Sequence, residues 1–153
     1  MSSNPDAQDT PALNGLQTLQ MLMREKRNPA IGDTLEFRLV EIDEGIAVFE
    51  GTPTERVYNP IGTVHGGYAA ALLDSACGCA VHSRLNADQA YTTAELKVSY
   101  HRALTKETGV VRAHGSIVSM GRRVAFAQAR LVDADDRLYA SATSTLLVME
   151  RRP

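Results

Sequence analysis

The spacing of hydrophobic residues changes from helical to alternating near the start of this chain. Apolar side chains recur every three or four residues between positions 13 and 27, and Asn28 and Pro29 end this pattern, which predicts an amphipathic helix. From Leu35 to Leu39 apolar and charged residues alternate, and Ile46–Gly51 resumes the alternation after a turn at residues 43–45. We therefore expect a helix followed by two strands.

A longer apolar segment, Gly66–Val81, follows a loop rich in Pro and Gly at residues 52–63 and predicts a buried second helix. Four strand patterns come after it, with short connections, at Tyr91–His101, Thr108–Ser119, Arg122–Val132 and Leu138–Met149. Antiparallel strands interrupted by one helix predict an α+β fold in which the sheet covers that helix. We expect residues 1–12 to form a flexible tail and residues 13–150 a single domain.

Composition and charge narrow the class of protein. Of the 153 residues, 44% are hydrophobic and 22% are charged, as in ordinary soluble domains. The formal net charge of −2 provides no general attraction to nucleic acid or to an anionic membrane. Residues 1–11 have no signal-peptide pattern, and Gly66–Val81 is too short to span a bilayer. We expect a cytoplasmic protein with neither nucleic acid nor membrane as a partner.

The two cysteines, Cys77 and Cys79, lie two residues apart in the predicted buried helix. At ~100° per residue their side chains point about 200° apart, so they cannot form a disulfide with each other. The chain has only four histidines, which are scattered. We therefore interpret both cysteines as core residues and expect no metal site.

Asp74 is the only charged residue between Gly66 and Val81. Because burying an unpaired carboxylate costs free energy, a lone Asp in an apolar helix usually has a hydrogen-bond or charge partner or a functional role. His65, Gly66 and Gly67 stand at the start of the same helix, where exposed backbone N–H groups can stabilise a developing oxyanion. A shielded carboxylate and an oxyanion site are what acyl-transfer hydrolysis requires.

Asn59, the His65-Gly66-Gly67 element, Asp74 and the segment Thr93–Tyr100 occur at spacings that resemble the hotdog-fold acyl-CoA thioesterases, in particular the 4-hydroxybenzoyl-CoA and phenylacetate-pathway branch. The resemblance extends from about residue 13 to residue 148. It implies a hotdog fold, in which a curved antiparallel sheet wraps around one long central helix, here with an N-terminal helix. It also implies a homodimer, often paired into a homotetramer, with active sites at the subunit interface.

The resemblance gives each candidate catalytic residue a role in hydrolysing acyl-CoA to a carboxylic acid and free coenzyme A. Asn59 and the backbone N–H of Gly66 would polarise the thioester carbonyl, and Asp74 of the opposite subunit would be the nucleophile or the general base. Thr93 of that subunit, or Thr92 if the register slips by one, would position the water. His65 is a further catalytic candidate, and its place before the helix is also typical of a residue that orders the loop or the helix start through a hydrogen bond. No cofactor is implied, since coenzyme A is part of the substrate.

Substrate binding is assigned to two further groups of residues. Guanidinium groups suit phosphates because their planar fork makes paired, charge-assisted hydrogen bonds. The candidates for the coenzyme A phosphates are Arg102, Arg122, Arg123 and Arg151, with Arg84 a weaker one. The acyl pocket is expected to include Tyr68, Leu72 and Leu73, and its preference for aryl or aliphatic groups stays open.

Three alternatives share this fold. A hotdog dehydratase or hydratase would pair a histidine with a carboxylate, and His82 lies eight residues after Asp74 on the same helix. A non-catalytic acyl-CoA sensor would keep the pocket and add a DNA-binding module, and we expect no such module before residue 13. A thioesterase acting on an acyl carrier protein would run the same reaction with a different partner.

Overall fold

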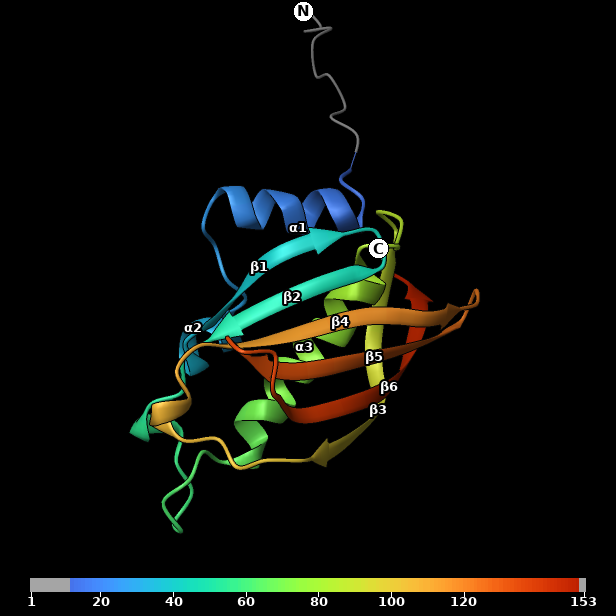
Figure 1. The fold of residues 1–153 in the computed structure, drawn as a ribbon. Helices are drawn as coiled ribbons and strands as arrows, with labels where there is room; N and C mark the ends of the chain where they lie inside the picture. The colour runs from blue at the N-terminus through green and yellow to red at the C-terminus, as the bar shows by residue number, and fades with distance from the viewer. Residues whose placement is uncertain (1–11, 152–153) are drawn as a thin grey trace, which may run out of the picture.

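The computed structural model describes residues 12–151, so the predicted tail lies outside the described residues except for its last position. Figure 1 shows one long helix, α3, crossing the face of a curved sheet, with a shorter helix, α1, beside the first strand. In chain order the elements are α1 (Gly15–Arg24), α2 (Ala30–Leu35), β1 (Phe37–Asp43), β2 (Ile46–Gly51), α3 (Gly66–His82), β3 (Gln89–Tyr100), β4 (Val111–Met120), β5 (Val124–Asp133) and β6 (Leu138–Glu150), with 3₁₀ turns at Glu55–Val57 and Lys106–Thr108. The predicted order is confirmed, and α2 is the one helix that the sequence pattern missed.

Helix α1 is shorter than the predicted range because both of its ends are capped. The Asn14 side chain accepts a hydrogen bond from the Gln17 N–H at 2.9 Å, and the Gln17 side chain accepts one from the Asn14 N–H at 3.0 Å. This reciprocal pair is a capping box. At the other end Lys26 has a φ of 52°, and the Arg27 N–H bonds to the Leu22 carbonyl at 2.9 Å. That is the Schellman arrangement that ends a helix.

The prediction that Leu35 lies in the first strand was wrong, since Leu35 is the last residue of α2. Pro29 at the N-cap of α2 has a φ of −56°, which is suited to a helix start. Glu36 then takes a left-handed φ of 57° and ends the helix, so the strand begins at Phe37. Leu35 happens to continue the alternation of the following strand, and this made a short helix look like extended chain.

The six strands form one antiparallel sheet in the order β1-β2-β4-β5-β6-β3. Gly45, with a φ of 77°, allows the tight turn between β1 and β2. The prediction of β2 as residues 46–51 is confirmed at both ends. The strand expected from residue 108 instead begins at Val111, because residues 106–108 form a 3₁₀ turn.

Small side chains bring α3 close to the inner face of the sheet. The residues of β4, β5 and β6 that pack in the core are largely alanines, each at most 5% exposed: Ala113, Ala125, Ala127, Ala129, Ala140 and Ala142. Where Gly115 of β4 faces Ala76 of α3, an added Cβ would lie 2.4 Å from the Ala76 backbone carbonyl. This close approach of a long helix to a curved sheet confirms the predicted α+β hotdog fold.

Strand β3 forms one edge of the sheet and is 12 residues long. It pairs with β6 from Gln89 to Tyr100, with a bulge between Thr93 and Glu95. Its other edge pairs with no strand within residues 12–151. A long, unpaired edge strand is a template for pairing with a second chain.

Candidate active site

His65 holds the start of α3 through hydrogen bonds of both its side chain and its backbone. The Nδ1 atom of His65 accepts a hydrogen bond from the Gly67 N–H at 2.8 Å, and the His65 N–H donates to the Val57 carbonyl at 2.8 Å. These two hydrogen bonds support the predicted ordering of the helix start, and a direct role of His65 in catalysis stays a prediction. The backbone N–H of Gly66 has no acceptor among residues 12–151, as expected in the first turn of a helix. It is therefore available to a ligand.

Tyr100, at the end of β3, lies directly beside Gly66. Its hydroxyl donates to the Gly66 carbonyl at 2.8 Å, and a Cβ added to Gly66 would lie 3.0 Å from that hydroxyl oxygen. The ring of Tyr100 thus occupies the space that a larger residue at position 66 would need. Sequence reasoning missed this contact, because an aromatic residue in a strand is common for reasons of packing alone.

An open cavity of about 430 Å³ adjoins the Gly66 N–H. Arg102 is the one predicted coenzyme A ligand that lines this cavity, and its guanidinium carbon lies 5.8 Å from the centre of the Tyr139 ring. A guanidinium at this distance from an aromatic face is held by a cation–π attraction. The full lining consists of Val64, His65, Gly66, Ala69, Tyr100, His101, Arg102, Ala103 and Leu104.

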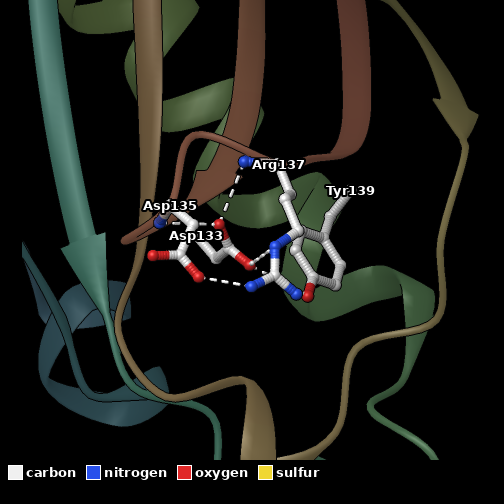
Figure 2. A network of polar contacts seen from close by, with 4 residues as sticks. All are labelled: Asp133, Asp135, Arg137 and Tyr139. Carbon is white, nitrogen blue, oxygen red and sulfur yellow. Dashed lines mark hydrogen bonds and ion pairs between the residues drawn. The ribbon is translucent and has the colours of Figure 1, made fainter.

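Tyr139 is itself held by the turn between β5 and β6 (Figure 2). Asp133 accepts hydrogen bonds from the backbone N–H groups of Asp135 at 2.9 Å and Arg137 at 3.0 Å, and the Tyr139 hydroxyl donates to it at 3.2 Å. The Arg137 guanidinium pairs with both carboxylates. The backbone hydrogen bond from Arg137 is the main reason that the pKa of Asp133 is lowered. This network positions the ring against which Arg102 packs.

The candidate catalytic residues Asp74 and Thr93, which the resemblance assigns to the same subunit, are in contact. The Thr93 hydroxyl donates to Oδ1 of Asp74 at 3.0 Å, and both side chains are half-buried. Thr92, the alternative, is exposed and points to the other face of β3, because neighbouring side chains alternate along a strand. The second oxygen of Asp74 has no hydrogen-bond donor among residues 12–151, so it can attack or accept a proton.

Gly66 and Asp74 are separated along the helix that carries them both. Eight residues at 1.5 Å each place them about 12 Å apart along the axis of α3. A single carbonyl group cannot contact both positions of one chain. Within one chain the structure therefore shows two separate groups of candidate residues, Asp74 with Thr93 and Gly66 with the adjoining cavity.

His82 does not pair with Asp74 within the chain. It lies at the C-terminal end of α3, about 12 Å beyond Asp74, with its ring 5.7 Å from that of Tyr91. Burial, reinforced by the nearby charge of Arg151, lowers the pKa of His82. The histidine–carboxylate pair that a hydratase would need is not formed by these two residues.

The Asn59 side chain forms its hydrogen bonds within its own loop. Its amide nitrogen donates to the Thr63 hydroxyl at 3.0 Å, and its amide oxygen accepts from the N–H groups of Ile61 and Thr63 at 3.1 and 3.2 Å. These bonds close the turn before α3 and leave one amide hydrogen of Asn59 uncommitted. Its role in polarising a carbonyl stays a prediction.

The three predicted acyl-pocket residues lie in the core. Leu72 and Leu73 are fully buried, Tyr68 is 4% exposed, and none of them lines the cavity beside Gly66. Their role in acyl binding stays a prediction. Val64, Ala69 and Leu104 supply the apolar lining of that cavity instead, and their scattered positions gave no signal in the sequence.

The buried hydroxyl of Tyr68 gives a stability prediction. It has no hydrogen-bond partner among residues 12–151, and burial raises its pKa to about 12. Because an unsatisfied buried hydroxyl costs about 1–3 kcal/mol, Tyr68→Phe should raise the free energy of unfolding by about 1 kcal/mol in urea titrations. The matched control is Tyr139→Phe, which removes a hydroxyl that donates to Asp133 and should lower stability. A destabilised Tyr68→Phe would show that this hydroxyl has a partner after all.

The four predicted coenzyme A arginines do not form one cluster. Arg102 follows the C-terminal end of β3, whereas Arg151 donates to the Gln89 carbonyl at the N-terminal end of β3, 2.9 Å away. Arg122 and Arg123 form the β4–β5 turn at the same end as Arg151, since the Val148 N–H donates to the Arg123 carbonyl at 2.9 Å. At about 3.3 Å per residue, the length of β3 keeps Arg102 far from the other three within one chain.

Both cysteines are buried and unpaired, as predicted. Burial, reinforced by the charge of Asp74, raises the pKa of Cys77 and of Cys79 to about 12, so both thiols are unreactive at neutral pH. In the part of the chain that the structure describes, no three His, Cys, Asp or Glu side chains are placed to share a metal ion. None of the helices described is long and apolar enough to cross a bilayer.

The hotdog fold, with a carboxylate and a free helix N-terminus on its central helix, is compatible with a thioester hydrolase. Residues 61–140, more than half of the chain, match the sequence model of the thioesterase superfamily, and the chain belongs to that family. The 1,4-dihydroxy-2-naphthoyl-CoA hydrolase of Listeria monocytogenes serotype 1/2a (strain 10403S) is 22% identical over 120 residues, which are 78% of this chain and 96% of the hydrolase.

Solved structures show the same fold. The phenylacetic acid degradation-related protein of Ralstonia eutropha JMP134 superposes with a TM-score of 0.74 at 28% identity, over 84% of this chain and 96% of that protein. The E. coli PaaI protein of the phenylacetic acid degradation operon superposes with a TM-score of 0.75 at 21% identity, over 91% and 94%. The predicted resemblance to hotdog thioesterases is thereby confirmed.

Proposed function

We propose that this protein hydrolyses acyl-CoA thioesters to a carboxylic acid and free coenzyme A. The observation that carries the proposal is the Asp74–Thr93 hydrogen bond of 3.0 Å on the helix whose first turn offers the free Gly66 N–H. A thioester is already activated, so its hydrolysis needs only a polarised carbonyl and a delivered oxygen nucleophile. Neither step calls for a cofactor or a metal.

The 12 Å separation within one chain supports an active site shared between two subunits. The Gly66 N–H and the Asn59 amide of one subunit would hold the thioester oxygen, and Asp74 and Thr93 of the other would face the carbonyl carbon. One well-placed oxyanion donor contributes a factor of about 10²–10³ in rate. The unpaired edge of β3 supports a dimer with a continuous sheet.

Asp74 can act in two ways that balance chemically. As a general base it takes a proton from water, the hydroxide adds to the carbonyl carbon, and the tetrahedral intermediate expels coenzyme A as a thiolate. As a nucleophile its carboxylate displaces the thiolate directly, and water then hydrolyses the mixed anhydride. Single turnover in ¹⁸O-labelled water separates the two. Only the nucleophilic route, with water attacking the Asp74 carbonyl of the mixed anhydride, would leave the carboxylic acid released in the first turnover unlabelled.

The proposed function is tested by incubating the protein with octanoyl-, benzoyl- and phenylacetyl-CoA. A disulfide reagent measures the thiol of the coenzyme A that is released. The buried Cys77 and Cys79 will not consume this reagent, because their pKa values are about 12. Turnover of one or more of these substrates supports the proposal, and the ranking of kcat/KM defines the acyl preference. Binding of acyl-CoA without turnover would favour a sensor or a carrier-protein substrate.

Subunit complementation tests the shared site. Gly66→Pro removes the N–H at the first helical position, where proline is tolerated, and His65 already has the extended conformation that precedes proline, with φ −59° and ψ 133°. The matched control, Gly66→Ala, adds a Cβ against the Tyr100 ring, as Gly66→Pro does, but keeps the N–H. Mixing Gly66→Pro chains with Asp74→Asn chains should restore about one quarter of wild-type activity, because half of the dimers are hybrids with one intact site. Mixtures as inactive as their parents would place the whole site within one chain.

We further propose a cytoplasmic homo-oligomer, with a homotetramer as its largest form. Four exposed apolar residues support a second contact between dimers, namely Ile46, Val118, Phe126 and Leu147, each at least 41% exposed. They come from neighbouring strands of one sheet. Multi-angle light scattering of wild-type protein and of Phe126→Lys would test this, since the charge should convert a tetramer into dimers.

A further inference from the structure

A second cavity, which shares no lining residue with the cavity beside Gly66, lies between α1 and the first two strands. This α1 pocket has a volume of about 480 Å³, within the usual range of small-molecule sites of about 300–1,000 Å³. Cys79, 7% exposed, lines it from α3 at a position five residues beyond Asp74. Its lining is Leu19, Leu22, Met23, Lys26, Arg27, Asn28, Pro29, Arg38, Leu39, Val40, Phe49 and Cys79.

The lining of the α1 pocket divides into apolar and cationic parts. Eight of these residues are apolar or a buried thiol, and the charged ones are Lys26, Arg27 and Arg38, with no carboxylate among them. Arg27 forms an exposed ion pair with Glu25 at 3.1 Å, and such pairs are weak. Arg38 pairs at 3.1 Å with the half-buried Glu50, which also binds Arg112 at 2.9 Å. Lys26 has no carboxylate partner within residues 12–151.

Lys26 also has an unfavourable backbone conformation. Its φ of 52° lies at the helix-terminating position where glycine or asparagine is preferred, and a lysine there is disfavoured by its Cβ. The conformation ends α1, and Lys26 lines the edge of the cavity with no carboxylate beside it in the described lining. The opposite wall is irregular as well, because the β1–β2 register shifts between Leu39 and Glu41 and sets Val40 in a bulge.

We propose that the α1 pocket binds an apolar carboxylate, a fatty or arylalkanoic acid whose carboxylate pairs with Lys26. The tail would lie between α1 and β1 against Leu22 and Phe49, where it replaces solvent contacts with apolar ones. The charge complementarity excludes a cationic ligand, and the apolar walls disfavour a small inorganic anion. The inference does not depend on the thioesterase activity, although a carboxylic acid is also the product of that reaction.

Calorimetric titration of sodium decanoate into the full-length protein tests the proposal with a matched pair of variants. Lys26→Gly removes the charge and relieves the strained φ, so it should raise the melting temperature of the ligand-free protein while weakening decanoate binding about tenfold. Arg24→Ala removes one charge from α1 at a position that does not line the pocket, and it should bind decanoate as the wild type does. A merely structural role for Lys26 could not produce opposite changes in stability and in affinity.

Three further results would overturn the proposal. The first is no saturable binding of decanoate to the wild-type protein. The second is equal affinity for decanoate and for uncharged 1-decanol, since the carboxylate would then contribute nothing. The third is loss of decanoate binding when coenzyme A is present or in Asp74→Asn, because this would locate the ligand in the active site. Retention of binding in Asp74→Asn, together with the tenfold loss in Lys26→Gly, would establish the α1 pocket.

Discussion

Asp74→Asn is expected to lower kcat by about 10²–10⁴-fold while the protein keeps its fold and oligomeric state. The amide is almost the same size as the carboxylate, and its oxygen can still accept the Thr93 hydrogen bond of 3.0 Å. It can neither take a proton from water nor attack a carbonyl. The thiol-release assay measures the loss, and circular dichroism with size-exclusion chromatography checks the fold and assembly.

Two graded variants accompany this test. Asp74→Glu keeps a carboxylate and moves it by one methylene, so it should retain more activity than Asp74→Asn. Thr93→Ala keeps the carboxylate and removes the hydroxyl that orients it, so its effect should be smaller than that of Asp74→Asn. If Asp74→Asn turned over acyl-CoA at nearly the wild-type rate, the proposed mechanism would fail even though the reaction class could stand.

Gly115→Ala is expected to lower the free energy of unfolding by about 3 kcal/mol, at the upper end of overpacking costs. The added Cβ would lie 2.4 Å from the backbone carbonyl carbon and oxygen of Ala76 and 2.9 Å from its Cβ. Backbone atoms in the middle of α3 cannot move aside as a flexible side chain would, so the helix and the sheet must separate. Urea unfolding of the purified variant measures the loss, which is a large fraction of the stability of a typical domain of about 5–15 kcal/mol.

The control for Gly115→Ala is Gly121→Ala. The same methyl group at Gly121, in the β4–β5 turn, meets only the Val124 carbonyl oxygen at 3.4 Å, and the φ of Gly121 is not in the left-handed region. This variant should stay within about 1 kcal/mol of the wild type. Equal destabilisation by the two variants would mean that the loss in Gly115→Ala does not come from contact with α3.

Much of the fold follows from patterns that are local in sequence. The small apolar run from Gly66 could be predicted as a buried helix because no other element tolerates such a composition at that length, and β2 was bounded by a turn and a glycine. Helix α2 could not be predicted, since six residues carry too few periods to outweigh the alternation through Leu35 and Phe37. Its end depends on the left-handed φ of Glu36, which residue type does not signal.

The site was predictable only in part, and for a similar reason. The resemblance to a family pointed to Asp74 and Thr93, and the place of His65 before the apolar helix indicated an ordering role. The structure shows hydrogen bonds at both places, while the catalytic roles stay predictions. The packing of Tyr100 on Gly66 joins residues 34 positions apart, and no local pattern encodes such a contact. The separation of Arg102 from Arg122, Arg123 and Arg151 likewise depends on the direction of β3 in the sheet.

The helix α3 also restricts how this family can vary in length. One residue inserted between Gly66 and Asp74 would turn the carboxylate by about 100° and shift it by about 1.5 Å, away from Thr93 and into the half-exposed position that Ser75 now holds. Insertions in the turn between β5 and β6 would extend only a surface loop. Distant relatives are therefore expected to keep the eight-residue spacing of these two positions even where few residues remain identical, and the spacing itself becomes a trait by which such relatives can be found.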